Sequence, residues 1–151
     1  MTNEEIKQSV SALFPSVTYD ETGEFLNILI ASGELRPLME ALRNNTAFSF
    51  DFLFCLTCID WKTHLMMVYH LLSKTHKYNI VVKARIADTN NPEIETVCDI
   101  WKTAIFHERE VYDLFGVKFL HHPDMRRLLL DEGWDGYPLR KNYVDENMIS
   151  I

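Results

Sequence analysis

Glycine is scarce in this sequence, with 5 residues among 151. Loops that bind dinucleotides or phosphates need closely spaced glycines, because only glycine lets the backbone approach the phosphates closely. Neither a G-x-G-x-x-G pattern nor a P-loop pattern is present. We therefore expect no site for a dinucleotide, a flavin or a nucleotide on this chain.

Cysteine is also scarce, and long apolar runs are absent. Three cysteines, an odd number, are not typical of a disulfide framework. No stretch approaches the roughly 18 consecutive apolar residues of a membrane-spanning helix. The N-terminal residues MTNEEIKQSV are too polar and acidic for a secretory signal. These absences predict a cytoplasmic protein without a membrane span.

Basic side chains are few in the first part of the chain. Residues 1–60 carry three basic and nine acidic side chains, a net charge of −6, against −7 for the whole chain. Binding of nucleic acid needs a basic face that neutralises phosphates. We therefore exclude nucleic acid as a partner. The overall composition, 47% hydrophobic and 25% charged, is that of an ordinary globular protein.

Helical and strand-like patterns alternate along residues 1–116, which predicts an α+β domain. Thr2 and Glu5 have the spacing of a capping box, and Pro15 ends the helix that they begin. Residues 50–59 form an apolar run that fits either a strand or a buried helix. We expect a mostly antiparallel sheet with helices packed on it. The other expected elements are strands at Val17–Asp20 and Phe25–Ile30 joined by a hairpin turn, a helix at Glu34–Arg43, strands at Leu65–Leu72 and Asn79–Ile86, and a helix at Ala104–Phe115 closed by Gly116.

Residues 117–151 lose this regularity and form the second predicted unit, an extended C-terminal segment. The segment contains two prolines and two glycines, yet it is too rich in large apolar side chains for a disordered tail. Such a segment lies on its own domain or on a partner, and aromatic and arginine side chains are common anchors of interfaces. We predict that it docks a partner through eight residues: Arg126, Arg127, Leu128, Trp134, Tyr137, Leu139, Arg140 and Lys141.

Two cysteines, Cys55 and Cys58, have the C-x-x-C spacing of some metal and redox sites. If they lie in a strand, residues three apart point to opposite faces, so the two sulfurs diverge. Only Cys98 could add a third thiolate, whereas an iron–sulfur cluster normally takes four. We interpret both cysteines as packing residues of the core.

The run His121-His122-Pro123-Asp124 could supply metal ligands or an acid/base pair. Adjacent histidines before a proline do not easily converge on one metal ion, and a residue before proline favours extended backbone. No glycine-flanked serine or cysteine nucleophile is nearby. We interpret the run as an extended turn. A stand-alone metalloenzyme built on His121, His122 and Asp124 is the least favoured alternative.

One carboxylate, Glu108, falls within the apolar arc of the helix expected at residues 104–115. A buried carboxylate must be paired or protonated. Arg109 and Asp113 fall outside the arc and are expected to form a surface pair at i, i+4 spacing. The alternative for Glu108 is a catalytic acid with a raised pKa. Because arginine binds carboxylates in a bidentate way, we predict a structural ion pair between Glu108 and one of Arg126, Arg127 and Arg140.

Three sequence blocks follow one another in order: Glu108–Gly116, His122–Leu129 and Gly133–Tyr143. They resemble the hallmark of the thirty-kilodalton (C-type) subunit of respiratory complex I. The family patterns are close to E-R-E-x-x-D-[LM]-F-G, H-P-D-L-R-R-[IL]-L and G-[FW]-x-G-[HY]-P-L-R-K-D-[FY]. Three ordered blocks are a much more specific signal than one short motif.

Segments upstream extend this resemblance to roughly residues 50–143. Residues 56–60 (LTCID) and 68–73 (VYHLLS) are similar to the family segments L-T-A-V-D and V-Y-H-L-L-S. The two C-x-x-C cysteines do not belong to the family pattern, which favours their interpretation as packing residues. Three departures look conservative: Met125, Tyr137 and Asn142.

The resemblance implies an α+β domain followed by an extended segment, and a function without an active site on this chain. The implied role is that of a cofactor-free scaffold subunit in the hydrophilic arm of proton-pumping NADH:quinone oxidoreductase, supporting electron transfer from NADH to quinone. NADH, FMN, iron–sulfur clusters and quinone then belong to partner subunits. The implied partners are the forty-nine-kilodalton (D-type) subunit and its neighbours in the hydrophilic arm. The membrane arm is linked indirectly, at the cytoplasmic side of the cell membrane.

An equivalent subunit of a related complex is the main alternative that the resemblance leaves open. Membrane-bound hydrogenases, reduced-cofactor dehydrogenases and the photosynthetic NDH complex are expected to share these sequence blocks. Co-purifying flavin would discriminate between them, because the blocks themselves do not identify the electron donor.

Overall fold

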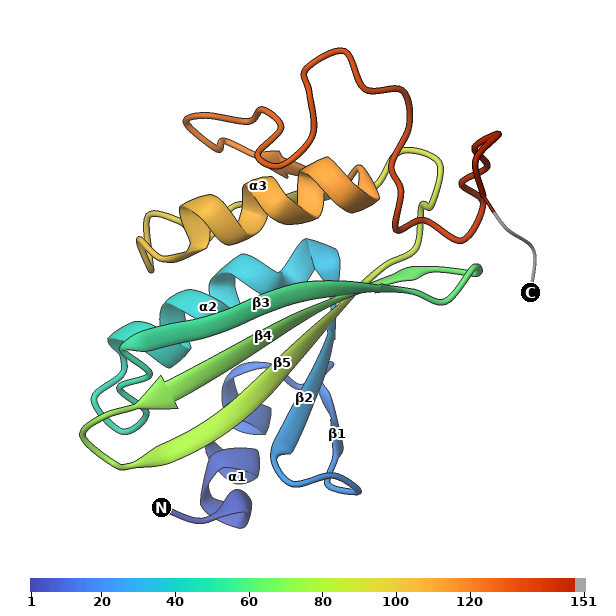
Figure 1. Ribbon diagram of the computed structural model, residues 1–151. Helices are drawn as coiled ribbons and strands as arrows, with labels where there is room; N and C mark the ends of the chain where they lie inside the picture. Colours follow the sequence, from blue (N-terminus) through green and yellow to red (C-terminus); the bar gives the residue numbers. More distant parts are fainter. Residues whose placement is uncertain (149–151) are drawn as a thin grey trace.

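The computed structural model describes residues 1–148, and residues 149–151, the last three of the predicted docking segment, lie outside the described part. Helices and a sheet are followed by an irregular C-terminal segment, so the predicted α+β fold is confirmed (Figure 1). The elements in chain order are α1 (Asn3–Leu13), β1 (Thr18–Asp20), β2 (Leu26–Ala31), the 3-10 helix η1 (Ser32–Glu34), α2 (Leu35–Asn44), β3 (Phe52–Asp60), β4 (Leu65–Ser73), β5 (Tyr78–Ile86), β6 (Glu93–Glu95), α3 (Ala104–Phe115) and β7 (Lys118–Leu120).

The main sheet has five strands in the order β1-β2-β5-β4-β3. All neighbouring pairs are antiparallel except β2 and β5, so the sheet is mostly antiparallel, as predicted. β1 and β2 form the expected hairpin, and most of the apolar run 50–59 is strand β3 rather than helix. The parallel pair joins strands that α2, β3 and β4 separate in the sequence, a non-local pairing that strand periodicity does not encode.

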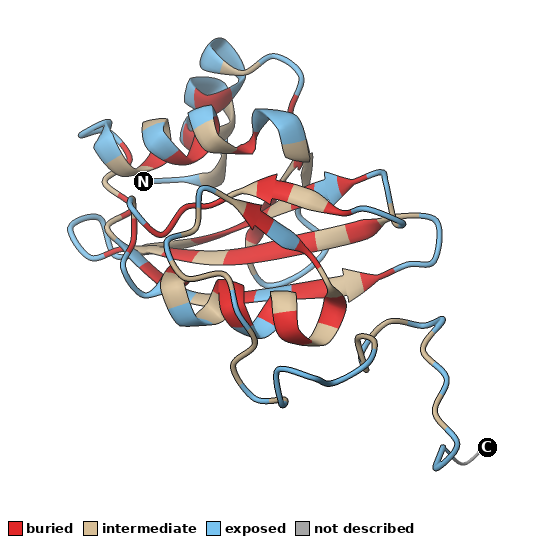
Figure 2. Cartoon of the chain, turned by 90° about the horizontal axis from the view of Figure 1, so that it is seen from above, coloured by how far each residue is buried: buried red, intermediate tan, exposed pale blue. Residues whose placement is uncertain are grey.

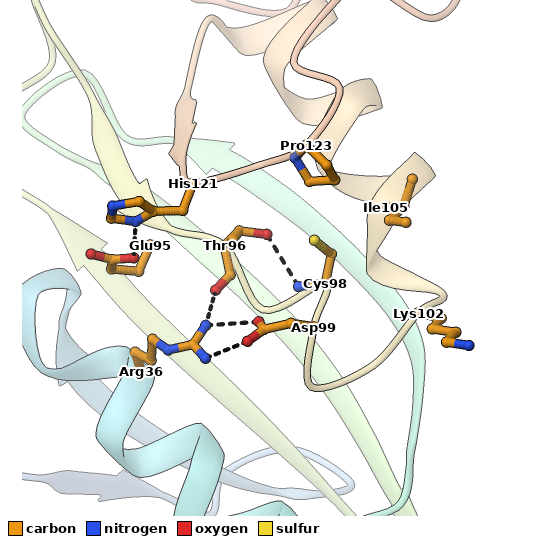
Figure 3. A pocket seen from close by; sticks show the side chains of 9 residues that line it. All are labelled: Arg36, Glu95, Thr96, Cys98, Asp99, Lys102, Ile105, His121 and Pro123. Carbon is orange, nitrogen blue, oxygen red and sulfur yellow. Dashed lines mark hydrogen bonds and ion pairs between the residues drawn. The ribbon is translucent and has the colours of Figure 1, made fainter.

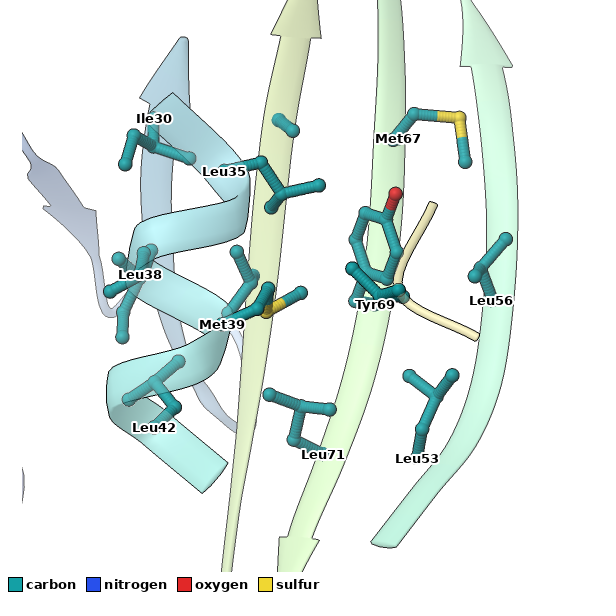
Figure 4. Close-up of a cluster of buried hydrophobic side chains, with 14 of the residues drawn as sticks. Ile30, Leu35, Leu38, Met39, Leu42, Leu53, Leu56, Met67, Tyr69 and Leu71 are labelled. Carbon is teal, nitrogen blue, oxygen red and sulfur yellow. The ribbon is translucent and has the colours of Figure 1, made fainter. Parts of the chain in front are cut away.

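One face of this sheet builds the hydrophobic core. Alternate side chains of β4, among them Met67, Tyr69 and Leu71, are buried beneath the helices. α2 lies across β2 and β5 (Figure 4), and α3 packs on β3. Each large aliphatic side chain that is fully buried contributes about 1.5–3 kcal/mol. α2 buries four at helical spacing, which explains why this short helix is held firmly: Leu35, Leu38, Met39 and Leu42.

The ends of α1 and α3 follow local chemistry that the sequence predicts. Thr2 and Glu5 form the capping box at the start of α1, each side chain accepting a hydrogen bond from the other residue's backbone N–H. α3 ends at Gly116, whose φ of +78° lies in the left-handed region, and the N–H of Gly116 donates to the carbonyl of Tyr112 at 2.9 Å. The chain therefore reverses direction after α3 and returns over that helix.

A small parallel pair, β6 and β7, connects the chain after α3 to the body of the molecule. Within the described residues, no helix or strand follows Leu120, and no residue from 121 to 148 is buried as a whole, although the side chains of His122 and Arg127 are only 0% and 9% exposed. Figure 2 shows this segment in tan and pale blue, in contrast to the red buried residues of the sheet and the inner sides of the helices. Among residues 1–148, no helix is long and apolar enough to cross a membrane.

Candidate functional site

The outer side of α3 is the place where the C-terminal segment is attached (Figure 1). Arg109 and Asp113 are both buried in the structure. The predicted surface pair between them is therefore wrong, since each binds the C-terminal segment instead. A helical wheel identifies the face that packs on the sheet, but it does not reveal that a second layer of chain covers the opposite face.

Asp113 is the centre of the first attachment point. Its Oδ2 accepts three consecutive backbone N–H groups, from Leu128, Leu129 and Leu130, at 3.3, 2.7 and 3.0 Å. Its Oδ1 accepts a hydrogen bond from Arg127 at 3.0 Å. Burial acts to raise the pKa of Asp113, but these donors outweigh it and hold the pKa below its ordinary value. The Asp113 carboxylate is therefore ionised, and it holds the backbone of this turn through these hydrogen bonds.

Arg127 links the same carboxylate to a later part of the segment. Nη1 also donates to the carbonyl of Asp113 at 2.8 Å, and Nη2 donates to the carbonyls of Trp134 and Gly136, both at 2.9 Å. The guanidinium lies over the ring of Tyr137, 4.9 Å from its centroid. Both terminal nitrogens are thus engaged within the chain, so Arg127 acts as an internal clamp.

Arg109 reinforces this clamp from the preceding turn of α3. Its Nε and Nη2 donate to the carbonyls of Arg126 and Arg127 at 3.2 and 2.9 Å. Its Nη1 lies 3.7 Å from a carboxylate oxygen of Asp124. Arg126 itself pairs with Asp124 at 2.8 Å, but its side chain is 60% exposed. Arg126 is therefore the member of the predicted arginine set that is open to a partner.

Asp60, at the end of β3, forms the second attachment point. Its Oδ2 accepts from Arg140 Nε at 3.1 Å and from the N–H of Lys141 at 2.9 Å, and its Oδ1 accepts from the N–H of Lys62 at 2.8 Å. Burial acts to raise the pKa of Asp60, but the donors lower it below its ordinary value. Arg140 also donates to the carbonyls of Phe115 and Thr89. One arginine thus ties the segment to β3, to α3 and to the loop before β6.

Tyr137 provides a third contact, between the segment and the end of α3. The N–H of Leu139 donates to the carbonyl of Leu114 at 2.9 Å. A Cβ built on Gly116 would lie 2.7 Å from Cδ2 of Tyr137. Gly116 therefore serves two purposes, because it allows the left-handed turn and leaves room for the tyrosine ring.

The attachments leave three large apolar side chains of the segment exposed to solvent. Leu129, Trp134 and Leu139 are 66%, 40% and 53% exposed. Among the eight residues predicted to dock a partner, four are exposed, namely Arg126, Trp134, Leu139 and Lys141. The other four, Leu128, Arg127, Tyr137 and Arg140, are partly buried. Phe106 on α3 is also exposed and was missed, because helical periodicity singles out only the inward face of that helix.

Glu108 is buried as predicted, but it is not paired with an arginine. Its carboxylate accepts hydrogen bonds from Thr96 Oγ1 and, at 3.0 Å, from the N–H of Val97. Burial raises the pKa of Glu108 to about 7, and these two hydrogen bonds oppose the shift. The predicted ion pair is wrong because Glu108 faces inward to residues 96–98. The three arginines lie with the outer segment and pair with Asp124, Asp113 and Asp60.

Cys98, Glu108 and His122 are the described residues that come closest to a metal site, with one potential ligand atom from each within 4.8 Å of the others. Both ring nitrogens of His122 are engaged, however. Nδ1 accepts from the N–H of Asp124 at 3.0 Å, and Nε2 lies 3.1 Å from the carbonyl of Ile105. A metal ion on Nε2 would require an imidazolate or loss of the amide hydrogen bond. The geometry favours a structural hydrogen-bond network.

Two other candidate ligand pairs do not converge in the structure: His121 with His122, and Cys55 with Cys58. His121 points to Glu95, at 2.9 Å, and not toward His122. Cys55 pairs with His70 and Cys58 with Met67 across the same two strands, so the two sulfurs lie on opposite faces of the sheet, as the strand argument predicts. Burial raises the pKa of Cys58 to about 12, which keeps its thiol protonated and suits packing.

A hollow of about 730 Å³ lies beside the buried network (Figure 3). Arg36 pairs with Asp99 at 2.5 Å and donates to the carbonyl of Thr96 at 2.9 Å, while the Cys98 thiol lies at its wall. Burial raises the pKa of Cys98, so the thiol is a poor nucleophile. The charged groups are mostly neutralised by neighbours, and the hollow offers no activated nucleophile.

The sequence family described as "Respiratory-chain NADH dehydrogenase, 30 Kd subunit" matches residues 28–147. The chain belongs to this family. The match spans both attachment carboxylates, Asp60 and Asp113, and the arginines that bind them. The predicted resemblance is therefore confirmed, and it includes the part of the molecule that fixes the C-terminal segment.

The share of each relative that this chain covers differs widely within the family. The C-type subunit of NADH-quinone oxidoreductase from Moorella thermoacetica is 36% identical over 138 residues, covering 90% of this chain and 91% of the relative. The C/D subunit from Phocaeicola vulgatus is 49% identical over 110 residues, covering 72% of this chain and 21% of the relative. The C-type subunit from Chloroherpeton thalassium is 43% identical over 104 residues, with 68% and 43% covered. The chain thus spans less than half the length of several relatives.

A solved structure shares the fold. A chain in the structure of the membrane-bound sulfane sulfur reductase, an archaeal respiratory membrane complex, has a TM-score of 0.78 and 28% sequence identity, covering 93% of this chain and 85% of that chain. The similarity covers far more than the sheet alone, because such coverage includes most of the irregular C-terminal segment.

Proposed function

We propose that this chain is a scaffold subunit of an NADH:quinone oxidoreductase and that its C-terminal segment docks a partner of the D type. The observation that carries the proposal is the construction of residues 121–148. Asp113 and Asp60 hold the segment in one conformation, while Leu129, Trp134 and Leu139 remain exposed. Tryptophan is among the residues most common at hot spots, and a surface that is already held in place loses less conformational entropy on binding.

Two fused relatives support a D-type partner. The C/D subunits from Phocaeicola vulgatus and Bacteroides thetaiotaomicron are 49% and 44% identical to this chain, which spans only 21% and 22% of their lengths. A fusion places a C-like part and a D-like part in one polypeptide, which favours their direct association. Where the two parts are separate chains, the same exposed segment is then available to the D-type partner.

The proposed contribution of this chain to electron transfer is mechanical. Its residues hold partner subunits in register, while NADH, FMN, iron–sulfur clusters and quinone bind to those partners. Three features support a chain without its own cofactor: the scarcity of glycine, the engaged ring nitrogens of His122 and the protonated buried thiol of Cys58. The complex would lie at the cytoplasmic side of the cell membrane, with neighbouring hydrophilic-arm subunits around this one, an indirect link to the membrane arm, and proton pumping coupled to electron flow.

A related respiratory complex is the second candidate. The structural similarity to a chain of the archaeal sulfane sulfur reductase complex favours this candidate, because the same fold occurs there in a respiratory complex that is a sulfane sulfur reductase. NADH oxidation by the purified native complex discriminates between the two. A complex that contains this chain, binds flavin and oxidises NADH supports the first proposal, and one that uses another donor supports the second.

Substitutions of exposed anchors test the docking role. We expect Trp134→Ala and Leu139→Ala to weaken assembly with the D-type partner by about 2 kcal/mol or more, roughly 30-fold in affinity. Leu13→Ala is a matched control, because Leu13 at the end of α1 is 53% exposed, the same fraction as Leu139. The set of proteins that co-purify from native membranes is the measurement. Normal assembly of both segment variants would contradict the proposal.

A further inference from the structure

The sheet has a second face that no helix covers within residues 1–148. Strand pairing identifies its residues, because directly paired residues point to the same side. One row across the sheet is Leu29, Lys83, Val68 and Thr57, and the next is Ala31, Arg85, Met66 and Ile59. We call this surface the open face. The buried partners of the core, such as Tyr69, alternate with these residues and point to the helices.

We propose that the open face is a second docking surface, which binds an acidic amphipathic segment of a partner subunit. This role goes beyond the docking role of residues 121–148, because the open face lies on another side of the molecule. It does not depend on which partner covers the C-terminal segment.

The apolar part of the open face lies over β3 and β4. Phe52 and Phe54 are both exposed and stack with ring centroids 6.2 Å apart, and Phe54 also packs on His70 at 5.6 Å. The strand register shifts between Leu53 and Cys55, so Phe54 sits at an irregularity that turns its ring to the same side as Phe52. Neighbouring phenylalanine rings left in water are unusual for a free surface and typical of an interface.

The charged part lies over β5. Within residues 1–148, neither Lys83 nor Arg85 forms an ion pair, although the chain carries a net charge of −7. Asp20, at the end of β1, accepts hydrogen bonds from Thr22; these bonds, and more weakly the charge of Lys83, lower the pKa of Asp20, but no ion pair forms. Burial lowers the pKa of His70, and the nearby charge of Lys83 lowers it further. A partner that carries carboxylates would neutralise these cations.

A hollow of about 280 Å³ joins the two cations to apolar walls. Leu29 and Met66 line it together with Lys83 and Arg85. This volume is smaller than that of most sites for drug-sized ligands, whose range begins at about 300 Å³. It suits the aspartate or glutamate side chains of a docked segment, whose apolar neighbours would lie on the phenylalanine pair.

Charge favours this occupant over a lipid surface or a second copy of the chain. Binding to an anionic membrane uses clusters of about 4–8 basic residues, whereas the open face has Lys83 and Arg85 at its centre. In a symmetric dimer the same patch meets itself, so the cations of both copies would be brought into one interface. A segment with carboxylates on one side and apolar groups on the other satisfies both parts of the face.

Lysine labelling in the native complex tests the proposal. We expect Lys83 to be acetylated at least tenfold more slowly in the complex than in the isolated full-length chain. Zero-length coupling by a carbodiimide should join Lys83 to an aspartate or glutamate of a partner. Lys77, in the β4–β5 turn, is the control and should react equally in both states. Equal labelling of Lys83 in both states, with no cross-link, would overturn the proposal.

A charge-reversal variant tests the same surface from the side of assembly. K83E/R85E should reduce the occupancy of the cross-linked partner at least tenfold, whereas K83R should leave the occupancy unchanged. Trp134→Ala should not affect the contact at the open face. Binding of the isolated chain to vesicles of anionic phospholipid, or dimerisation that K83E/R85E abolishes, would identify another occupant and refute the proposal. If the double variant fails to fold, the labelling of wild-type Lys83 decides alone.

Discussion

Asp113 on α3 and Arg127 in the C-terminal segment form one buried ion pair whose carboxylate also accepts three consecutive backbone N–H groups. An exposed ion pair contributes less than about 1 kcal/mol, but this one is shielded and fully hydrogen-bonded. The pair therefore sets the conformation of the turn from which the exposed anchors project.

Asp113→Asn tests the weight of this pair. Removing one partner of a buried pair costs about 3–5 kcal/mol, so we expect a fall of this size in the free energy of unfolding, measured by urea at pH 7. The folded-state pKa of Asp113 lies below its ordinary value of 3.8. The stability that the ionised group provides is therefore present above pH 3.8 and is lost as the pH falls through the folded-state pKa. A difference that persists unchanged at pH 2 would contradict this account.

Arg140→Ala and Arg126→Ala should differ, although both arginines follow the same helix. The side chain of Arg140 is 13% exposed, and its removal leaves Asp60 without a guanidinium partner. We expect the free energy of unfolding to fall by about 3 kcal/mol. This is the low end for a buried pair, because two backbone N–H groups still donate to Asp60. Arg126 is 60% exposed, and its removal should cost under about 1 kcal/mol. Thermal and urea unfolding of the two variants measure the difference. Equal losses of stability would show that Arg140 does not hold the segment more strongly than Arg126 does.

Glu108 gives folding stability a pH dependence of the opposite sign. Its pKa is raised by burial from 4.5 to about 7, so between these values the folded state keeps a proton that the unfolded chain releases. The contribution of Glu108 to stability is therefore greatest below pH 4.5, and up to about 3 kcal/mol of it is lost as the pH rises to 7. Glu108→Gln cannot ionise and should flatten this part of the profile. Urea unfolding between pH 4.5 and 8 checks it, and parallel profiles would refute the assignment.

Gly116→Ala should be costly for two separate reasons. A residue with Cβ at φ +78° carries a penalty of about 1–2 kcal/mol, and the new methyl group would displace the Tyr137 ring. We expect a total loss of about 2 kcal/mol or more in unfolding free energy, with weaker order of residues 137–141 by amide exchange. Gly23→Ala is the control, because nothing lies within 4 Å of its Cβ position. A Gly116 variant as stable as the Gly23 variant would contradict the close contact.

The elements with local signals were predictable from the sequence. The capping box of α1 and the glycine end of α3 are set by a few neighbouring residues, and both are confirmed. The hairpin of β1 and β2 follows from a short turn. The parallel pairing of β2 with β5 and the strand identity of β3 depend on distant partners, which a single sequence does not specify.

The site was only partly predictable, for a related reason. Placing Glu108 in the core was correct, because periodicity reports which side of a helix faces the sheet. Its partners Thr96 and Val97 come from a loop whose position depends on the whole fold. Sequence patterns alone do not identify Asp60 and Asp113 as attachment points, because an aspartate is usually exposed. Both lie in segments that resemble the family patterns, and that resemblance was the available signal.

A photoreactive residue placed at position 134 in the native complex tests whether the C-terminal segment docks the D-type subunit. The side chain of Trp134 is exposed and its carbonyl is held by Arg127, so the probe points outward from a fixed backbone. We predict that illumination joins position 134 to the D-type subunit, whereas the same probe at position 13, on α1, does not. Reaction of the probe at position 134 only with water, or cross-links only to other subunits, would contradict docking of the D-type subunit on this segment.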